Sequence, residues 1–272
     1  MKKRFSFFAL AAALAVMPSI SMAQDWPNRP VRVVVPFDAG STPDSIARVV
    51  SDRLSARLGQ PMIVDNKSGV GGNLGTDAIA KAAPDGQTIG VSIAGPLAVN
   101  PLLYKKMPYN PAIDLVPVTV AVSQASVLVV SAKHAAASAK EFAATLKSGK
   151  AKMSFASIGA GSISHLAMQT VAVQTGGDFV HVPYRGSGAA VTALLSGDVD
   201  MALLPAAAVM PHVKSGKIRG LAVASAKRSP SLPDLPTFAE SGLPDIQADA
   251  WIGFIVPAKT PVAIVAKLHD QI

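Results

Sequence analysis

The polar residues best suited to chemistry lie in short loops that directly follow apolar runs. The first such loop, Phe37–Thr42, follows the β-branched run Val31–Val35 and precedes a helical pattern. Thr42 is expected to cap that helix, Pro43 suits its first position, and Asp44 places negative charge in its first turn. A strand, a loop and a helix start arranged in this way point free N–H groups at one spot, which favours binding of an anion.

Two later loops repeat this arrangement. Ser157–Ser164 (S-I-G-A-G-S-I-S) follows the run Met153–Ala156, and Tyr184–Gly188 (Y-R-G-S-G) follows Val180–Pro183. Their glycines allow a ligand to approach the backbone closely, and their hydroxyl groups offer hydrogen bonds. Because functional side chains of α/β proteins gather at the carboxyl ends of strands, we expect these loops to face Phe37–Thr42 across a cleft.

Ser162 and His165 also suggest a secreted serine hydrolase, with Ser162 as nucleophile and His165 as base. The nucleophile elbow of such enzymes needs G-x-S-x-G, whereas this chain reads G-S-I-S-H from Gly161. Ser162 lies at a helix entrance, where serine commonly acts as a cap. We therefore expect a capping or ligand-binding role and no catalytic residue, and keep the hydrolase as the alternative. For His165, donation to a ligand and donation to a neighbouring carbonyl are equally open.

The sequence predicts neither a metal site nor a cofactor. The glycine-rich stretch Asn66–Gly75 lacks the G-x-G-x-x-G spacing of a dinucleotide site. The chain has no cysteine, which excludes disulfides and cysteine ligands. Neither H-x-x-x-H nor H-E-x-x-H spacing links the five histidines, which are His134, His165, His181, His212 and His269.

Residues 1–23 are expected to form a secretory signal peptide. The basic start Lys2–Arg4 precedes the apolar stretch Phe5–Met17. Small residues at Ser21 and Ala23 suit cleavage after Ala23. The apolar stretch is shorter than the ~20 residues needed to span a bilayer. We therefore expect an exported, soluble protein of the periplasm.

Composition narrows the class of partner. The formal net charge is +8, from 25 basic and 17 acidic residues. Removal of the three basic residues of the signal peptide leaves 22 against 17, or +5. No run of lysine and arginine remains, so we expect no nucleic-acid partner. Hydrophobic residues at 50% and charged residues at 15% are typical of a well-buried α/β protein.

The order of strand and helix patterns predicts two lobes. The β-loop-α pattern is broken by two successive apolar runs, Leu115–Val122 and Val127–Ser131, and then resumes. We place one hinge between these runs, at Ser123–Ser126, and a second near Asp245–Ala250. A late strand, Trp251–Val256, is expected to cross back to the first lobe.

The predicted fold is therefore α/β, with a mixed, mainly parallel sheet in each lobe and a ligand cleft between the lobes. The first lobe is expected to comprise residues 24–123 and 246–272, and the second lobe residues 124–245. We expect a monomer.

Seven segments in order give the chain a family likeness. It resembles the Bug or TctC family, the periplasmic solute receptors of the tripartite tricarboxylate transporter system. The segments are Arg29–Asp44 (R-P-V-R-V-V-V-P-F-D-A-G-S-T-P-D), Leu58–Gly75, Ala83–Thr88 (A-P-D-G-Q-T), Phe155–Leu166, His181–Gly186 (H-V-P-Y-R-G), Ser196–Asp200 and Leu235–Pro244.

The resemblance implies a type II, venus-flytrap binding protein. Such a receptor holds a small organic acid between its lobes and delivers it to an integral membrane permease. Backbone N–H groups and ordered waters are then expected to grip the ligand carboxylate. The first-lobe contacts implied are Phe37, Ala39, Gly40, Ser41 and Thr42, flanked by Asn73 and Ala94. The second-lobe contacts implied are Ser157, Ser162, His165, Tyr184 and Pro205.

Three features depart from the family pattern. Asp38 and Ser41 stand where relatives have a small or apolar residue and a second glycine, and the orientation of Asp38 is open. The apolar segment Leu204–Ala208 replaces a polar contact, which suggests that the distal part of the ligand is apolar or aromatic. Relatives continue beyond the position of Ile272, so the chain is expected to be truncated, and whether it is a fragment or a functional short form stays open. The solute is not identified, and a sensor for a membrane kinase stays an alternative to transport.

Overall fold

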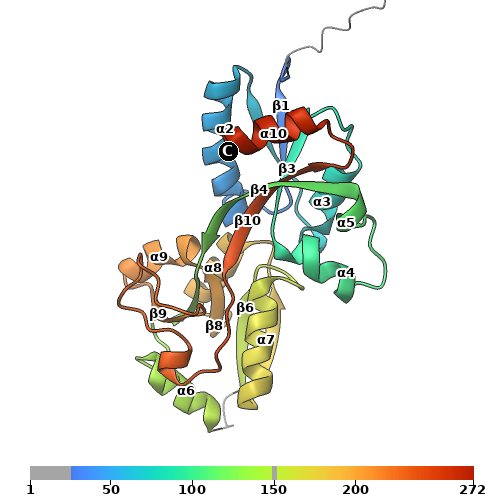
Figure 1. Ribbon diagram of the computed structural model, residues 1–272. Coiled ribbons are helices and arrows are strands. Elements are labelled where there is room, and N and C mark those ends of the chain that lie inside the picture. Colours follow the sequence, from blue (N-terminus) through green and yellow to red (C-terminus); the bar gives the residue numbers. More distant parts are fainter. Residues whose placement is uncertain (1–25, 149–151) are drawn as a thin grey trace, which may run out of the picture.

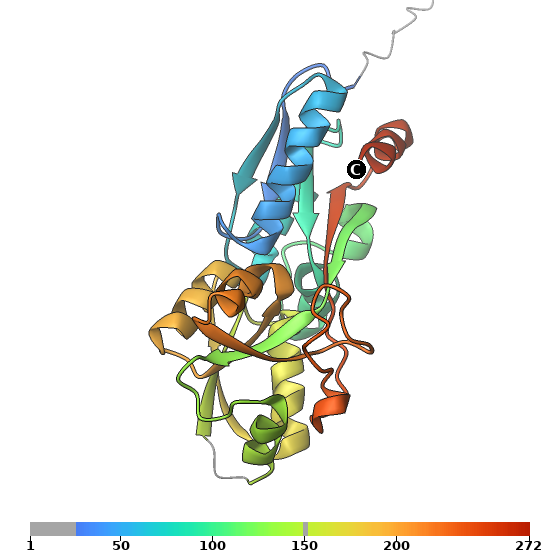
Figure 2. The ribbon, with the colours of Figure 1, turned by 90° about the vertical axis from the view of Figure 1, so that its left-hand side faces the viewer.

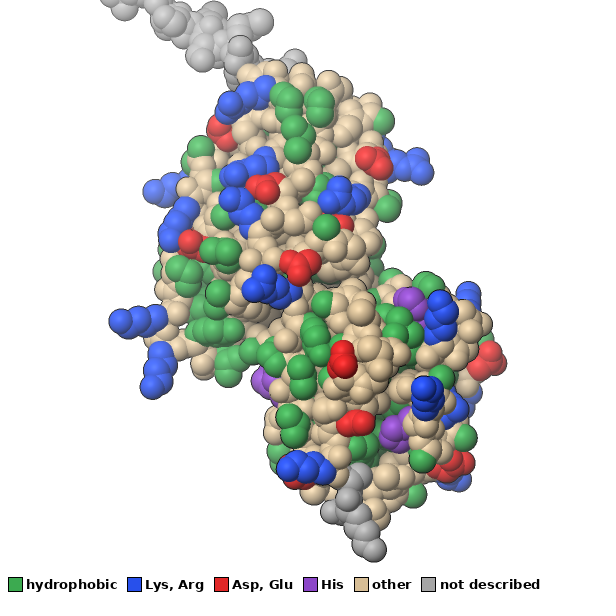
Figure 3. Space-filling model, turned by 180° about the vertical axis from the view of Figure 1, so that it is seen from behind, with side chains coloured by type: hydrophobic (Ala, Val, Ile, Leu, Met, Phe, Trp, Pro, Cys, Tyr) green, Lys and Arg blue, Asp and Glu red, His purple; other side chains and the backbone are tan. Residues whose placement is uncertain are grey.

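The protein forms two lobes, each around one five-stranded sheet (Figure 1), in a computed structural model that describes residues 26–148 and 152–272. The predicted signal peptide, residues 1–23, lies outside the described residues. Figure 3 shows the two lobes as joined bulges, with basic and acidic side chains interspersed over this face. In the part of the chain that the structure describes, no helix has the length and apolar character needed to cross a bilayer.

The first sheet has the strand order β2-β1-β3-β10-β4. β1 is parallel to β2 and β3, whereas β10 is antiparallel to β3 and β4. Four strands therefore run one way and β10 runs the other. The bounds are β1 Val31–Val35, β2 Met62–Asn66, β3 Thr88–Ser92, β4 Leu115–Gln124 and β10 Ala250–Pro257.

Helices cover both faces of β1. Val33 and Val35 pack in the same buried cluster as Leu54 of α2, whereas Val34 packs with Ile79 of α3. This two-sided burial explains the unbroken β-branched run in the sequence. The first-lobe helices are α2 Thr42–Leu58, α3 Asn73–Ala80, α4 Asn100–Leu103, α5 Pro111–Asp114 and α10 Val262–Gln271, with a 3₁₀ turn at Val70–Gly72 and a π-turn at Gly95–Val99.

The second sheet has the order β7-β6-β8-β5-β9. β6 is parallel to β7 and β8, and β5 is antiparallel to β8 and β9. Its strands are β5 Ser126–Ser131, β6 Lys152–Ser157, β7 Asp178–Pro183, β8 Met201–Pro205 and β9 Ile218–Val223. Its helices are α6 Ala139–Lys147, α7 Ile163–Thr175, α8 Ser187–Ser196, α9 Ala206–Lys214 and the 3₁₀ turn Ala239–Ser241.

The chain passes between the lobes at two neighbouring places (Figures 1 and 2). β4 ends at Gln124 and β5 begins at Ser126, so one residue separates the two sheets. The return enters the first sheet at Ala250, which pairs with Gln124. The predicted architecture, two lobes with mixed and mainly parallel sheets, is confirmed, and the exact borders of the lobes stay a prediction.

The start of α2 differs by one residue from the prediction. Ser41, not Thr42, is the N-cap, and its hydroxyl accepts a hydrogen bond from the backbone N–H of Asp44. Ser41 has extended backbone angles (φ −72°, ψ 161°), as an N-cap requires. Thr42 is therefore already helical, and its hydroxyl is free to bond elsewhere.

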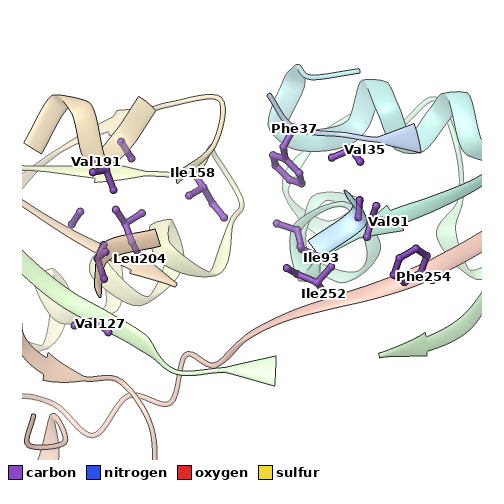
Figure 4. Close-up of a cluster of buried hydrophobic side chains, with 14 of the residues drawn as sticks. Val35, Phe37, Val91, Ile93, Val127, Ile158, Val191, Leu204, Ile252 and Phe254 are labelled. Carbon is purple, nitrogen blue, oxygen red and sulfur yellow. The ribbon is translucent and has the colours of Figure 1, made fainter. Parts of the chain in front are cut away.

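One buried apolar cluster extends from the first lobe into the second. Its first-lobe members include Phe37 and Ile93, and its second-lobe members include Ile158 and Leu204. Figure 4 shows Ile158 on the side of its lobe that faces Phe37 and Ile93. The loops that follow β1, β3 and β6 therefore meet where the lobes touch.

Candidate functional site

The Phe37–Thr42 loop contacts the second lobe through hydrogen bonds. The backbone N–H of Thr42 donates to the Ser187 hydroxyl at 3.1 Å, and the two hydroxyl oxygens also lie 3.1 Å apart. The N–H of Asp38 donates to the Arg185 carbonyl at 3.4 Å. Because Thr42 and Ser187 are both buried, the lobes are in closed contact at the first turns of α2 and α8.

Asp44 holds the loop in shape. Its carboxylate accepts hydrogen bonds from the Gly40 N–H at 2.9 Å, the Asn66 amide at 2.9 Å and the Arg48 guanidinium at 3.0 Å. Burial opposes ionisation of Asp44, but these hydrogen bonds outweigh it and lower the pKa of its carboxyl. The Asn66 amide also donates to the Phe37 carbonyl. Sequence reasoning gave Asp44 only a role in the helix dipole, although Arg48 four residues later signals an ion pair.

The hydroxyls of Ser157 and Ser162 shape the loop after β6. Ser162 caps α7, which is one of the two roles that the sequence leaves open for it: its hydroxyl accepts from the His165 N–H at 3.3 Å and donates to the Gly159 carbonyl at 2.6 Å. The Ser157 hydroxyl bonds the backbone of Gly159 and lies 2.6 Å from Nε2 of His181. Both side chains are buried, and the hydrogen bonds named here lie within their own lobe.

Two imidazoles stack behind this loop. The ring centroids of His165 and His181 are 3.9 Å apart, with an angle of 15° between the rings. Nδ1 of His165 accepts a hydrogen bond from the Gly161 N–H, so this ring supports the loop backbone. Burial lowers the pKa of both rings, and the adjacent His165 helps to lower the pKa of His181 to about 4. Sequence reasoning did not assign His181 to the site.

A narrow cavity lies between the lobes. Its volume is about 30 Å³, which is room for about two water molecules. Three of the predicted contacts, Thr42, Ala94 and Pro205, line it. The remaining lining residues are Pro43, Ile93, Gly95, Gln124, Ile158, Ile163, Asp249, Ala250, Trp251 and Ile252.

Three helices begin at this cavity. The lining includes Thr42, the first residue of α2, and Ile163, the first residue of α7. It also includes Pro205, the N-cap of α9. The N-terminus of a helix carries partial positive charge from the helix dipole. Helix ends from both lobes therefore favour an anion between them.

Other predicted contacts line two wider cavities at the junction of the lobes. Gly40 and Thr42 line a cavity with Ser187 of α8. Phe37 and Tyr184 line a cavity on the other side, with the glycine turn at Gly71. Tyr184 directly follows β7, as predicted. The structure thus brings the loops that contain these residues together at one junction.

Six of the predicted contacts line none of these three cavities: Ala39, Ser41, Asn73, Ser157, Ser162 and His165. The Asn73 side chain is inside the first lobe, where its oxygen accepts from the Asn100 amide at 2.6 Å and the Tyr109 hydroxyl at 3.0 Å. Ala39 is exposed on the loop after β1. Asp38 is half-buried, and its carbonyl accepts from the Ser41 N–H within the same loop. These partners leave Asn73 outside the narrow cavity.

The geometry of Ser162 and His165 does not suit nucleophilic catalysis. The backbone N–H of His165, not its ring, bonds the Ser162 hydroxyl. Nδ1 of His165 accepts from the Gly161 N–H, so the neutral ring carries its proton on Nε2 and neither nitrogen is free to take a proton from serine. Among residues 26–148 and 152–272, no group of three or more His, Asp or Glu side chains is placed to hold a metal ion.

Comparison with known proteins gives one consistent result. The model of the tripartite tricarboxylate transporter family receptor (TctC) matches residues 46–272. Protein BugT of Bordetella pertussis is 36% identical over 273 residues, which cover 100% of this chain and 84% of BugT.

Two solved structures are similar throughout. The R. palustris protein Rpa4515 with adipate is 35% identical, with a TM-score of 0.88 over 91% of this chain and 83% of that one. MatC from Rhodopseudomonas palustris with bound malate is 34% identical, with a TM-score of 0.84 over 90% of this chain and 84% of that one.

Proposed function

We propose, because this chain belongs to the family of tripartite tricarboxylate transporter receptors, that it captures a small carboxylate between its lobes and delivers it to a membrane permease. The family consists of periplasmic solute-binding proteins, and this chain has the same fold as they have. The solute class, delivery to the permease, the absence of an enzymatic step, the monomeric state and export by residues 1–23 belong to the proposal.

One observation carries the choice of a carboxylate. Three helix N-termini from two lobes border a single cavity. Backbone N–H groups and helix ends bind a carboxylate without an arginine or lysine. Adipate in Rpa4515 and malate in MatC are both carboxylates, which supports the same class here.

The proposed contacts begin with the residues that line the narrow cavity, Thr42, Ala94 and Pro205. The loops that contain the other predicted contacts border the same junction of the lobes. Binding shifts the population towards the closed form, because the ligand touches both lobes at once. Rotation about residue 125 and the stretch 246–249 would open and close the site.

A thermal-shift screen of the mature chain tests capture. We expect acids to raise the melting temperature, because a ligand that binds only the folded state stabilises it by RT ln(1 + [L]/Kd). Mono-, di- and tricarboxylates are compared with the corresponding amides, which have the same shape without the charge. Equal responses to an acid and its amide would contradict the anion site.

Deletion of the gene tests delivery. Cells without the receptor should lose uptake of the radiolabelled acid, and a plasmid copy should restore it. Unchanged uptake combined with a lost transcriptional response to the acid would instead support the sensor alternative.

Hydrolysis of a generic ester by the purified chain, abolished in Ser162→Ala, would support the hydrolase.

A further inference from the structure

We propose that the preferred ligand is a monocarboxylate with an apolar body, and that Asp249 disfavours a second carboxylate. This inference rests on the proposed function and specifies its substrate class. It depends on the lining of the narrow cavity between the lobes, taken with the charges that surround it.

The cavity lining is apolar on both sides. Ile93 and Ile252 come from the first sheet and its loops, and they are 7% and 3% exposed. Ile158 and Ile163 come from the loop and helix that follow β6. Trp251 on β10 adds an indole side chain. Contact with hydrocarbon stabilises an apolar surface of this kind, whereas a charged group buried against it loses its hydration.

Two polar side-chain atoms of the lining have partners in the protein. The Thr42 hydroxyl bonds Ser187, and the Gln124 side-chain oxygen accepts from the Ala207 N–H at 2.9 Å. The positive ends of the helix dipoles described above remain as the place for one carboxylate. They belong to α2, α7 and α9, so a single anionic end can interact with both lobes.

Charge around the cavity works against a second anion. None of the described lining residues is a lysine, arginine or histidine, and its one charged member is Asp249. Asp249 is exposed, at the position where the chain re-enters the first sheet. Arg185 borders the separate cavity with Phe37 and Tyr184. A second carboxylate would therefore lose water against isoleucine and tryptophan, or face the carboxylate of Asp249.

Matched acids test the inference by calorimetry on the mature chain. Hexanoate and adipate have the same carbon number and differ by one carboxylate, as do benzoate and terephthalate in the aromatic series. We expect the monocarboxylate of at least one pair to bind about tenfold or more tightly than its partner, from desolvation and like charge. Equal or tighter binding of the dicarboxylate in both pairs overturns the inference.

A variant assigns the effect to Asp249. In Asp249→Asn, adipate should bind about threefold or more tightly than in the wild type, whereas hexanoate affinity stays unchanged. Asp270→Asn is the matched control, because Asp270 is an exposed carboxylate on α10 outside the cavity. An unchanged adipate affinity in Asp249→Asn overturns the role of this residue.

Fluorescence separates failure of this inference from failure of the proposed function. The chain has two tryptophans, so Trp26→Phe leaves Trp251 as the reporter. Benzoate should change its emission, because the ring packs against the indole. If none of the four acids binds and no carboxylate shifts the melting temperature, both proposals fail. If only dicarboxylates shift it, the receptor function stands and the monocarboxylate preference is overturned.

Discussion

Ser187 is the residue through which the second lobe holds α2. Its buried hydroxyl is the partner of both the N–H and the hydroxyl of Thr42. The contact joins residues 145 positions apart and links the two lobes, so separation of the lobes would break it. An open form would expose both groups to water, which satisfies them equally well.

Substitution of Ser187 by alanine should therefore favour the open form. The closed form alone would keep the Thr42 N–H buried without an acceptor, at a cost of about 1 kcal/mol or more. We expect weaker ligand binding and a larger radius of gyration by small-angle X-ray scattering at subsaturating ligand. Ser215→Ala, at the exposed end of α9, serves as control. Unchanged scattering and affinity in Ser187→Ala would contradict the role of this hydroxyl.

Ser162 is expected to affect stability more than affinity. Its hydroxyl caps α7 and bonds the Gly159 carbonyl. Ser162→Ala should lower the free energy of unfolding by about 1 kcal/mol, the usual cost of a lost N-cap. Urea denaturation measures this, with Thr170→Ala on the exposed face of α7 for comparison. A loss of affinity without a loss of stability would instead indicate a direct ligand contact.

At the scale of elements, the loop between β6 and α7 depends on two stacked rings. Phe155 of β6 lies beside them, with its ring centroid 4.9 Å from that of His181. His181 reaches the loop through Ser157, and His165 reaches it through Gly161. Protonation of either ring would place charge in an apolar stack, next to the other imidazole.

Stability should consequently fall as the pH falls. The pKa of His181 is lowered from 6.5 to about 4 in the folded protein, and that of His165 is lowered too. The unfolded chain therefore binds more protons between about pH 6.5 and 4, which favours unfolding in that window. The melting temperature should decrease less steeply with acid in His181→Phe. His212→Gln controls for loss of a histidine, and equal slopes in all three proteins would refute the assignment.

At the scale of the whole molecule, the two lobes meet closely where the Gly161 backbone packs against the Asn100 side chain. Gly161 has φ +80°, and a Cβ added there would overlap Oδ1 of Asn100 in the other lobe. Asn100 is itself fixed by its amide, which donates to the Asn73 oxygen and the Gly71 carbonyl. The space between the lobes thus depends on the absence of a side chain at Gly161, and also at Gly71, where a Cβ would lie 2.7 Å from the Ala160 carbonyl oxygen.

Gly161→Ala should fold and fail to close. Gly176→Ala is a matched control, because Gly176 has φ +68° at the end of α7 and open space around its Cα. Both variants suffer similar backbone strain, and only Gly161→Ala adds a clash between lobes. We expect similar melting temperatures and about tenfold or more weaker ligand binding in Gly161→Ala. Equal affinities would show that the lobes close without this contact.

Local patterns predict the elements, and long-range contacts decide the site. The strand Val31–Val35 has the predicted bounds, and Ser162 caps its helix, because neighbouring residues determine both. Asn73 bonds Asn100 and Tyr109, which lie 27 and 36 positions away. No local spacing reveals such partners. His181 joins His165 only because α7 packs against β7.

The pairing of Ala250 with Gln124 has a consequence for engineering. The whole segment 125–249 leaves and re-enters the first lobe at adjacent positions, so it is topologically an insertion within one β-hairpin. A short turn that joins Gln124 directly to Ala250 would keep all five strands of the first sheet in a single covalent chain. A fluorescent reporter domain whose own termini lie close together could also be inserted at this junction without interrupting a strand.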